Sequence, residues 1–292
     1  MADDPSRTVL VTGSSSGFGR LTAETLARRG HTVFASMRAV DGRNRDIAAD
    51  LRALADREGI ALHVIALDVT DDASVRSAVD HVLTRAGRLD VVVNNAGIGG
   101  VGHVEAFTPE QVHRLFDVNV VGAHRVNRAV LPHMRDRGSG LLVHVTSTFG
   151  RLVVPSVGVY CATKFALEAL AEAYRYELAA VGVDSVIVQP GAYPTGFADR
   201  ILLAADADRA AGYGAAADLP HRLGAGFDEA FSGPTAPNPQ DVADVILALI
   251  ETPYGERPLR TVVDRFTAPA VEAINETAGR IQTEILRSMG LE

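Results

Sequence analysis

The chain contains very little cysteine: Cys161 is the only one among 292 residues, so no internal disulfide can form. Sparse cysteine is ordinary in a reducing compartment, and we expect a cytoplasmic protein. No run of about 18 apolar residues is present, so we expect no membrane-spanning helix. Residues 1–7 are polar and acidic, without the basic segment and apolar run of a signal peptide, so we expect none.

Basic clusters and metal-binding motifs are also missing. The formal net charge is −8 and the lysines and arginines are scattered, which argues against nucleic acid or an anionic membrane surface as the main partner. The nine histidines show no ligand spacing such as H-E-x-x-H, so we expect no metal site. The chain does have 47% apolar residues, enough to bury a large core. These features favour an ordinary soluble, globular protein.

Short apolar stretches alternate with longer amphipathic stretches along the chain. This alternation is typical of βαβ units, in which right-handed crossovers place helices on both faces of a parallel sheet. The predicted strands cover residues 8–11, 32–35, 62–67, 90–93, 141–145, 185–188 and 259–263. The predicted helices cover residues 20–29, 46–57, 73–86, 110–135, 163–180, 241–250 and 268–289. The pattern predicts an α/β fold, a doubly wound Rossmann fold with a mainly parallel seven-stranded sheet flanked by helices.

No repeat or Gly/Ser-rich linker divides the chain, so we expect a single Rossmann-type domain over residues 1–292. The sequence Thr108-Pro109-Glu110-Gln111 has the form of a capping box with proline at the first helical position, which predicts a helix start. Residues 192–237 are rich in Ala, Gly and Asp and only weakly periodic, so we predict a long substrate-binding loop or lid there. Residues 265–292 form the predicted C-terminal helical extension.

A glycine-rich turn lies between the first predicted strand and the first predicted helix. Glycine lets backbone amides approach a pyrophosphate closely, and the helix N-terminus stabilises its negative charge. A glycine triplet also occurs in ordinary tight turns, but its place here favours a dinucleotide site. Its spacing is G-x-x-x-G-x-G, and the residues that we expect to bind the cofactor are Gly13, Ser15, Ser16, Gly17, Phe18 and Gly19.

Tyr160 and Lys164 are four residues apart, so on a helix their side chains share a face. A phenol titrates near 10, which makes it a poor base at neutral pH. An ammonium group about 4 Å away would stabilise the phenolate by roughly 4 kcal/mol at an effective dielectric constant of 20, as an upper figure. We therefore expect Lys164 to lower the pKa of Tyr160, which could then act as a general acid in reduction or a base in oxidation. Alone, such a pair is usually a solvated tyrosine beside a lysine.

Ser147 follows an apolar stretch at the carboxyl end of a predicted strand. Ligands of open parallel sheets bind at that edge, where a hydroxyl can hold a carbonyl oxygen while charge develops on it. A serine in this position can also be a simple turn former. Three features in this order, the glycine-rich turn, Ser147 and the Tyr160–Lys164 pair, favour a catalytic site.

With these motifs the chain resembles the classical short-chain dehydrogenase/reductase family over residues 7 to about 195. The resemblance implies an oxidoreductase that acts on CH–OH or C=O groups with NAD(P), and a homodimer or homotetramer formed through the two long central helices. It implies that Asn119 holds a water on a proton relay with Lys164, and that Lys164 binds the nicotinamide ribose. The implied catalytic set is Asn119, Ser147, Tyr160 and Lys164. The implied cofactor contacts are Asp68, Val69, Asn95, Ala96, Gly97, Tyr160, Lys164, Pro190, Gly191 and Thr195.

The end of the second predicted strand selects between the two nicotinamide cofactors. An acidic residue there accepts a hydrogen bond from the ribose 2′-hydroxyl of NAD, whereas a basic residue pairs with the 2′-phosphate of NADP. The segment here ends in Arg38 without an acidic residue, and Ser16 could add a hydrogen bond. NADP(H) is therefore favoured over NAD(H), although Arg38 could be an ordinary surface arginine and Asp41 could bind the ribose.

The favoured function is an NADP(H)-dependent reductase of a small-molecule ketone or aldehyde, bulky and apolar. An NAD-dependent alcohol dehydrogenase of the same fold is the first alternative, and Arg38 separates the two. A non-catalytic dinucleotide sensor is an alternative of another class. A sensor would be expected to lose Tyr160 or Lys164, and this chain has both.

Overall fold

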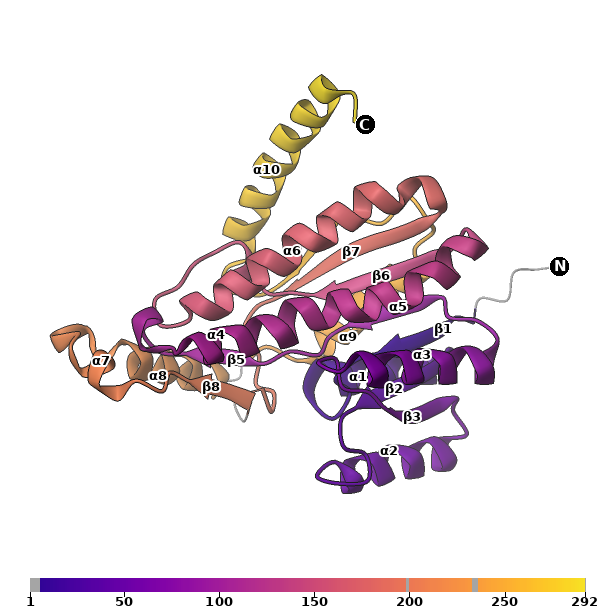
Figure 1. Ribbon diagram of the computed structural model, residues 1–292, viewed down its shortest axis with the longest axis horizontal. Coiled ribbons are helices and arrows are strands. Elements are labelled where there is room, and N and C mark those ends of the chain that lie inside the picture. Colours follow the sequence, from indigo (N-terminus) through magenta and orange to yellow (C-terminus); the bar gives the residue numbers. More distant parts are fainter. Residues whose placement is uncertain (1–5, 198–199, 233–235, 292) are drawn as a thin grey trace.

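Seven parallel strands form the central sheet, in the order β3-β2-β1-β4-β6-β7-β9 (Figure 1). The computed structural model describes residues 6–197, 200–232 and 236–291. The strands of this sheet are β1 (Thr8–Val11), β2 (Thr32–Met37), β3 (Leu62–Ala66), β4 (Val91–Asn94), β6 (Gly140–Val145), β7 (Val183–Pro190) and β9 (Arg260–Val263). The predicted α/β fold with a seven-stranded parallel sheet is confirmed.

Side chains of the central strands alternate between two cores, one on each face of the sheet. In β1, Val9 and Val11 belong to one core and Leu10 to the other, and all three are fully buried. Burying such a side chain stabilises the fold by about 1.5–3 kcal/mol, so strands buried on both faces are continuously apolar. The first core packs against α1 (Gly17–Arg28), α2 (Arg45–Glu58) and α9 (Gln240–Glu251), and the second against α3 (Asp72–Ala86), α5 (Gly122–Arg137) and α6 (Gly158–Leu178).

The strand order reverses between β1 and β4. From β1 the chain builds outward through β2 and β3, and it then returns to the other side of β1 to form β4. The carboxyl ends of β1 and β4 therefore diverge into separate loops at one edge of the sheet. Open α/β sheets bind ligands at such a switch point.

The helix predicted over residues 110–135 consists of three pieces: α4 (Pro109–Phe116), a π turn (Asp117–Val121) and α5. The capping box is confirmed, since Thr108 and Gln111 exchange hydrogen bonds in both directions. The predicted helical segment is confirmed, since these three pieces follow one another without a break, and the π turn takes up an extra residue where Asn119 turns inward. There Asn119 Oδ1 accepts from the Ile98 amide and Nδ2 donates to the Ile98 carbonyl, both at 2.9 Å.

The predicted loop over residues 192–237 is more regular than expected. It holds β8 (Ile201–Leu203), α7 (Ala207–Ala211), a 3₁₀ turn (Gly214–Ala216) and α8 (Leu219–Phe231). Strand β8 forms because the backbone of β5 (Gly99–Val101) offers it a parallel partner, which weak sequence periodicity does not reveal. Residues 198–199 and 233–235 of this segment lie outside the described residues, as do residues 1–5 and 292 of the predicted single domain.

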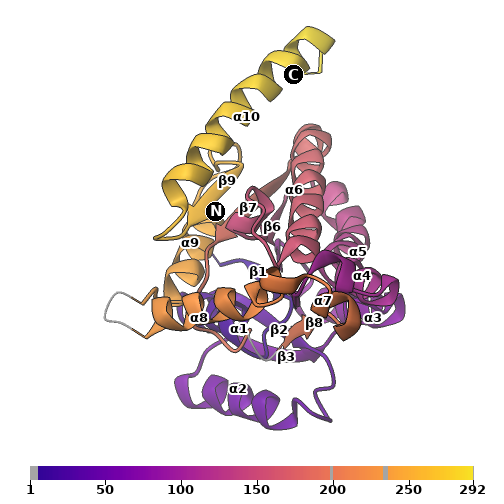
Figure 2. The same ribbon diagram turned by 90° about the vertical axis from the view of Figure 1, so that its left-hand side faces the viewer.

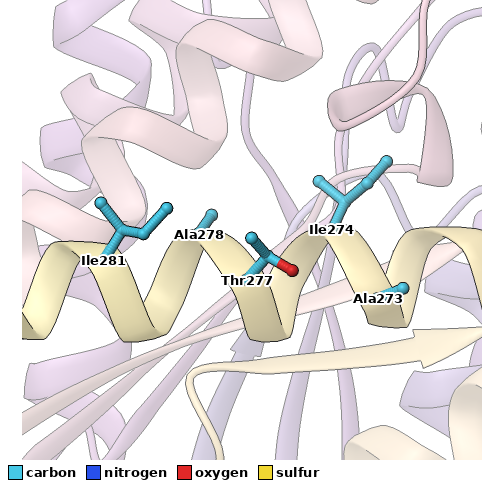
Figure 3. Close-up of a pocket in the computed structure, with 5 residues that line it drawn as sticks. All are labelled: Ala273, Ile274, Thr277, Ala278 and Ile281. Atoms are coloured by element: carbon cyan, nitrogen blue, oxygen red, sulfur yellow. The ribbon is translucent and has the colours of Figure 1, made fainter.

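The predicted C-terminal helical extension is α10 (Ala268–Met289), which projects from the body of the molecule in both ribbon views (Figures 1 and 2). Val271 is its one buried residue. Near its base, Asn275 Nδ2 donates to Gln189 Oε1 of β7 at 2.7 Å. Farther out, Ile274, Ala278 and Ile281 point to the same side of the helix, where they border a shallow apolar hollow (Figure 3).

Within residues 6–197, 200–232 and 236–291, no helix combines the length and the apolar character that crossing a bilayer requires. The same stretch of chain holds no group of three or more His, Cys, Asp or Glu side chains arranged to hold a metal ion.

His144 is a buried ionisable residue in the middle of the sheet. Its side chain on β6 is fully buried and stacks on Tyr174, with ring centroids 6.3 Å apart. Neither ring nitrogen has a hydrogen-bond partner among the described residues. Burial lowers the pKa of His144 to about 3, so the imidazole is neutral at physiological pH.

We predict that His144 makes the fold sensitive to mild acid. The unfolded histidine binds a proton near pH 6.5 but the folded one only near pH 3, so this contribution to stability is lost as the pH falls from 6.5 towards 3. Between pH 7 and pH 5, the free energy of unfolding of the wild type should fall by about 2 kcal/mol more than that of His144→Leu, measured by urea denaturation. His221→Leu, at a side chain 83% exposed, should behave as the wild type. An equal acid response in His144→Leu would contradict the prediction.

Candidate active site

The glycine-rich turn after β1 has no room for a side chain at Gly13 or at Gly19. Gly13 has a φ of +71°, and a Cβ on it would lie 2.8 Å from the Ala96 Cα. A Cβ on Gly19 would lie 2.6 Å from the Gly13 carbonyl oxygen. Glycine is needed at both positions, because the first φ is left-handed and the second backbone is in close contact with the turn.

Thr12 joins this turn to the loop after β4. Its hydroxyl accepts from the backbone amides of Asn95 and Ala96, both at 3.0 Å. In return, Asn95 Nδ2 donates to the Thr12 carbonyl at 2.8 Å and to the Gly13 carbonyl at 3.3 Å. The predicted cofactor residues of the two loops are thus bonded to each other across the switch point.

The turn leads into the N-terminus of α1, where Ser16 is the N-cap residue. Its hydroxyl does not cap the first helical turn, and Ser15, Ser16, Gly17 and Phe18 are all half-buried rather than buried. The first amides of a helix have no partner within the helix and carry a partial positive charge. The close-packed glycines together with this accessible helix end fit a dinucleotide pyrophosphate.

Arg38 and Asp68 follow the carboxyl ends of β2 and β3, next to the turn. Arg38 Nη1 lies 4.0 Å from Asp68 Oδ2, and the arginine side chain is 43% exposed. Asp68 Oδ1 also accepts from the amide and the hydroxyl of Thr70. The neighbouring Val69 is buried and borders Gly122 at the start of α5. Arg38 therefore lies near the glycine-rich turn with its guanidinium partly exposed beside the Asp68 carboxylate.

Tyr160 and Lys164 both lie on α6, which begins at Gly158, five residues before the predicted start. The Lys164 ammonium lies 5.6 Å from the centroid of the Tyr160 ring, and it donates to the Val145 carbonyl at 3.1 Å. Val145 is the last residue of β6, two before Ser147. The helix and the strand end thus bring these three predicted catalytic residues to one edge of the sheet.

Burial has opposite effects on the pKa values of the tyrosine and the lysine. It raises the pKa of Tyr160, and a hydrogen bond with Ser147 acts in the other direction. It lowers the pKa of Lys164 to about 8, while the nearby Glu168 carboxylate raises it. The expectation that Lys164 lowers the pKa of Tyr160 was wrong, since removal from water dominates for the phenol. At pH 7 the phenol is therefore protonated and the ammonium is charged.

Asn119 lies in the π turn, beside Lys164. A Cβ on Gly97 would lie 3.3 Å from Asn119 Oδ1 and 3.8 Å from Lys164 Nζ, so all three residues border one small volume. Asn119 Nδ2 also donates to the Thr163 hydroxyl at 3.0 Å, and this hydroxyl donates to the Tyr160 carbonyl at 2.7 Å. The fourth predicted catalytic residue therefore lies beside Lys164 and is linked through Thr163 to the backbone of Tyr160.

The segment after β7 lies against the glycine-rich turn. The Gly191 amide, which follows Pro190, donates to the Val263 carbonyl at 2.9 Å. Thr195 approaches Gly17 closely enough that a Cβ on the glycine would lie 3.4 Å from the Thr195 Cβ. The Tyr193 and Phe18 rings meet edge to face, with centroids 5.3 Å apart. The last predicted cofactor residues thus lie between the glycine-rich turn, which is the cradle (residues 13–19), and the catalytic edge, which is the edge of the sheet near Ser147, Tyr160 and Lys164.

A sequence model of the short chain dehydrogenase family matches residues 7–204. The chain belongs to this family. Its relatives include oxidoreductases that act on CH–OH and C=O groups, in agreement with the enzyme class and the family predicted from the motifs.

Two relatives of this short-chain dehydrogenase differ in their substrates. It is 36% identical over 193 residues to the 3-ketodihydrosphingosine reductase of Bacteroides thetaiotaomicron, covering 66% of each chain. It is 40% identical over 197 residues to 17-beta-hydroxysteroid dehydrogenase type 1 of Homo sapiens, covering 66% of this chain and 59% of the relative. The matched segment thus spans two thirds or less of each relative's length.

Solved structures resemble the short-chain dehydrogenase over a longer stretch. A short-chain dehydrogenase from Streptomyces avermitilis has a TM-score of 0.77 at 30% identity, covering 98% of both chains. A gluconate 5-dehydrogenase from Burkholderia cenocepacia, solved with NADP and tartrate, has a TM-score of 0.61 at 34% identity, covering 65% of this chain and 73% of that one. A relative from Burkholderia phymatum, solved with NAD, has a TM-score of 0.75 at 25% identity, covering 97% of both. The two Burkholderia structures were thus both solved with a nicotinamide dinucleotide.

Three residues of this short-chain dehydrogenase contact the site but were not singled out from the sequence. Thr163 supports both Asn119 and Tyr160, and its place directly before Lys164 was a usable signal. Glu168, one helical turn after Lys164, is fully buried and accepts from Thr146, Gln189 and Arg260. Arg200 donates to Ser15 and Ser16 of the glycine-rich turn, and no local pattern in the sequence predicts this contact.

We predict that Gly19→Ala disrupts the cradle, because the new Cβ would lie 2.6 Å from the Gly13 carbonyl oxygen. Dissociation constants for NADPH and NADH, from nicotinamide fluorescence titrations, should rise at least tenfold. Gly279→Ala is the matched control, since Gly279 is helical with open space around it. The control should keep wild-type affinity and gain up to about 1 kcal/mol of stability. Wild-type cofactor affinity in Gly19→Ala would contradict this account of the turn.

Proposed function

We propose that this short-chain dehydrogenase is an NADP(H)-dependent reductase of bulky, apolar ketones or aldehydes. The observation that carries the proposal is the meeting of Ser147, Tyr160 and Lys164 at the edge of β6, with Asn119 beside them. The cradle at residues 13–19 would hold the cofactor with its nicotinamide next to Tyr160. When bound, the cofactor supplies a hydride to the carbonyl carbon.

The protonation states favour Tyr160 as the proton donor. Its raised pKa keeps the phenol protonated at pH 7, ready to protonate the carbonyl oxygen as that oxygen becomes an alkoxide. Ser147 would hold the same oxygen through its hydroxyl. Lys164, with a pKa of about 8, is charged at pH 7 and stabilises the phenolate that remains after the transfer. Asn119, next to Lys164, would hold a water that returns the proton.

Two arguments support a bulky, apolar substrate. Phe197 packs near Tyr160, with ring centroids 6.1 Å apart, so an aromatic wall borders the reacting group. Beyond it, Phe107, Leu115 and Val159 form a small apolar core. Relatives that share 36% and 40% identity are named for a keto-sphingoid and a hydroxysteroid, both large and mainly apolar.

The choice of NADP(H) rests on Arg38. Its exposed guanidinium at the end of β2 suits a 2′-phosphate, to which it would make a charge-assisted contact. An NAD-dependent alcohol dehydrogenase remains the alternative, in which Asp41 or Asp68 binds the ribose hydroxyls. A dinucleotide sensor is less well supported, since such a protein needs no buried Tyr160–Lys164 pair.

We keep the expectation of a homodimer or homotetramer, formed through α5 and α6, and of a cytoplasmic location.

The reaction is tested by Tyr160→Phe. Loss of the acidic hydroxyl should lower kcat for ketone reduction by about 100-fold or more, with the dissociation constant for NADPH within about threefold of wild type. A panel of steroid, sphingoid and small ketones supplies the substrates, and NADPH oxidation is followed by absorbance. Tyr254→Phe, the same change at an exposed tyrosine far along the sheet, is the control and should keep wild-type turnover. Near-normal turnover in Tyr160→Phe would remove this residue from the proposed role.

The cofactor preference is tested by Arg38→Asp. We expect the wild type to bind NADPH at least tenfold more tightly than NADH, about 1.4 kcal/mol, and the variant to lose or reverse this difference. Arg43→Asp makes the same charge change at another exposed arginine of the next turn and should leave the ratio unchanged. An unchanged ratio in Arg38→Asp would show that another group binds the phosphate.

A further inference from the structure

Arg200 spans from the segment after β7 to the glycine-rich turn. Its Nη2 donates to the Ser15 hydroxyl at 2.9 Å and to the Ser16 hydroxyl at 2.6 Å. The contact joins residues more than 180 positions apart, and the arginine side chain is half-buried rather than solvated. Both serines lie at the N-terminal end of α1, where the cradle would hold a phosphate.

The position of Arg200 is fixed from two directions. On its amino side, Thr195 borders Gly17 and Tyr193 packs on Phe18. On its carboxyl side, the chain enters β8 at once, and Ile201 is paired in register with Gly99 of β5. A guanidinium held in this way reaches the turn without a large loss of side-chain entropy when it binds a ligand.

The chemistry of the contact favours an anion as a third partner. A serine hydroxyl can accept from a guanidinium while its own hydrogen is donated to another acceptor. A phosphate at the turn could therefore take hydrogen bonds from both hydroxyls and from the helix amides, with the arginine charge directly behind them. Guanidinium groups pair with phosphate more strongly than with neutral acceptors, since both partners are charged and the donor fork matches two oxygens.

We propose that Arg200 binds a phosphate group of the dinucleotide cofactor, as a contact from the segment after β7. This inference rests on the proposed function. The same segment carries Phe197, which packs near Tyr160. Binding of the phosphate by Arg200 would therefore also hold the aromatic wall of the substrate pocket in place. Two phosphate sources share this chemistry, namely the pyrophosphate common to both cofactors and the 2′-phosphate of NADPH alone.

The test compares Arg200→Ala and Arg200→Lys with the wild type by fluorescence titration of NADPH and NADH. Arg200→Ala should weaken binding at least tenfold, and Arg200→Lys should recover part of the loss because it keeps the charge. An equal loss for both cofactors assigns Arg200 to the pyrophosphate, and a loss confined to NADPH assigns it to the 2′-phosphate. Arg209→Ala is the matched control, because Arg209 lies in α7 and pairs with Glu105 and Asp206. The control should bind both cofactors as the wild type does.

The salt dependence of cofactor binding distinguishes a direct contact of Arg200 with phosphate from a purely structural role of Arg200 in the segment after β7. If Arg200 pairs with phosphate, the dissociation constant of the wild type should rise more steeply between about 50 and 300 mM NaCl than that of Arg200→Ala. Unchanged affinity in Arg200→Ala, or weaker affinity with the wild-type salt response, would overturn the inference. Both results would leave the proposed function intact. The proposed function would fail instead if the wild-type protein preferred NADH or if Tyr160→Phe kept normal turnover.

Discussion

The site depends on the hydrogen bonds that Thr12 and Asn95 exchange across the switch point of the sheet. Strands β1 and β4 separate there, and their loops would be free to move apart without a link between them. The Thr12 hydroxyl holds the amides of Asn95 and Ala96, and the Asn95 amide group holds two carbonyls of the glycine-rich turn. Because Gly13 also packs directly on Ala96, the turn and the loop after β4 hold each other in place at the N-terminus of α1.

Burial determines the electrostatics of the catalytic edge. Removal from water favours the neutral form of both ionisable partners, so the pKa of Tyr160 rises and that of Lys164 falls. The Glu168 carboxylate, one helical turn from Lys164, partly offsets the fall in the pKa of the lysine. The same carboxylate forms an ion pair with Arg260 on β9, at 2.9 Å, which links a strand at the far edge of the sheet to the catalytic edge. The pair is thereby set to donate a proton at neutral pH.

The sequence was sufficient to predict the parts of the molecule that depend on local pattern. Apolar runs located the strands, and the spacing of Gly13, Gly17 and Gly19 identified the cradle because turn geometry needs glycine at fixed offsets. The Tyr160–Lys164 pair followed from helical spacing. Three features were out of reach because they depend on residues distant in the chain. They are the π turn at Asn119, the pairing of β8 with β5, and the direction of the Tyr160 pKa shift, which depends on packing around the phenol.

The π turn before α5 makes the number of residues in this region as important as their identity. An α-helix advances by about 100° per residue, so the extra residue rotates everything after it relative to α4. With this rotation Leu115 of α4 faces one apolar cluster, while Val126, Val130 and Met134 of α5 face the sheet. A single-residue deletion near Asn119 would turn that second face towards solvent, whatever residue was lost. Homologous chains that keep this sheet packing should therefore tolerate substitutions here far better than changes in length.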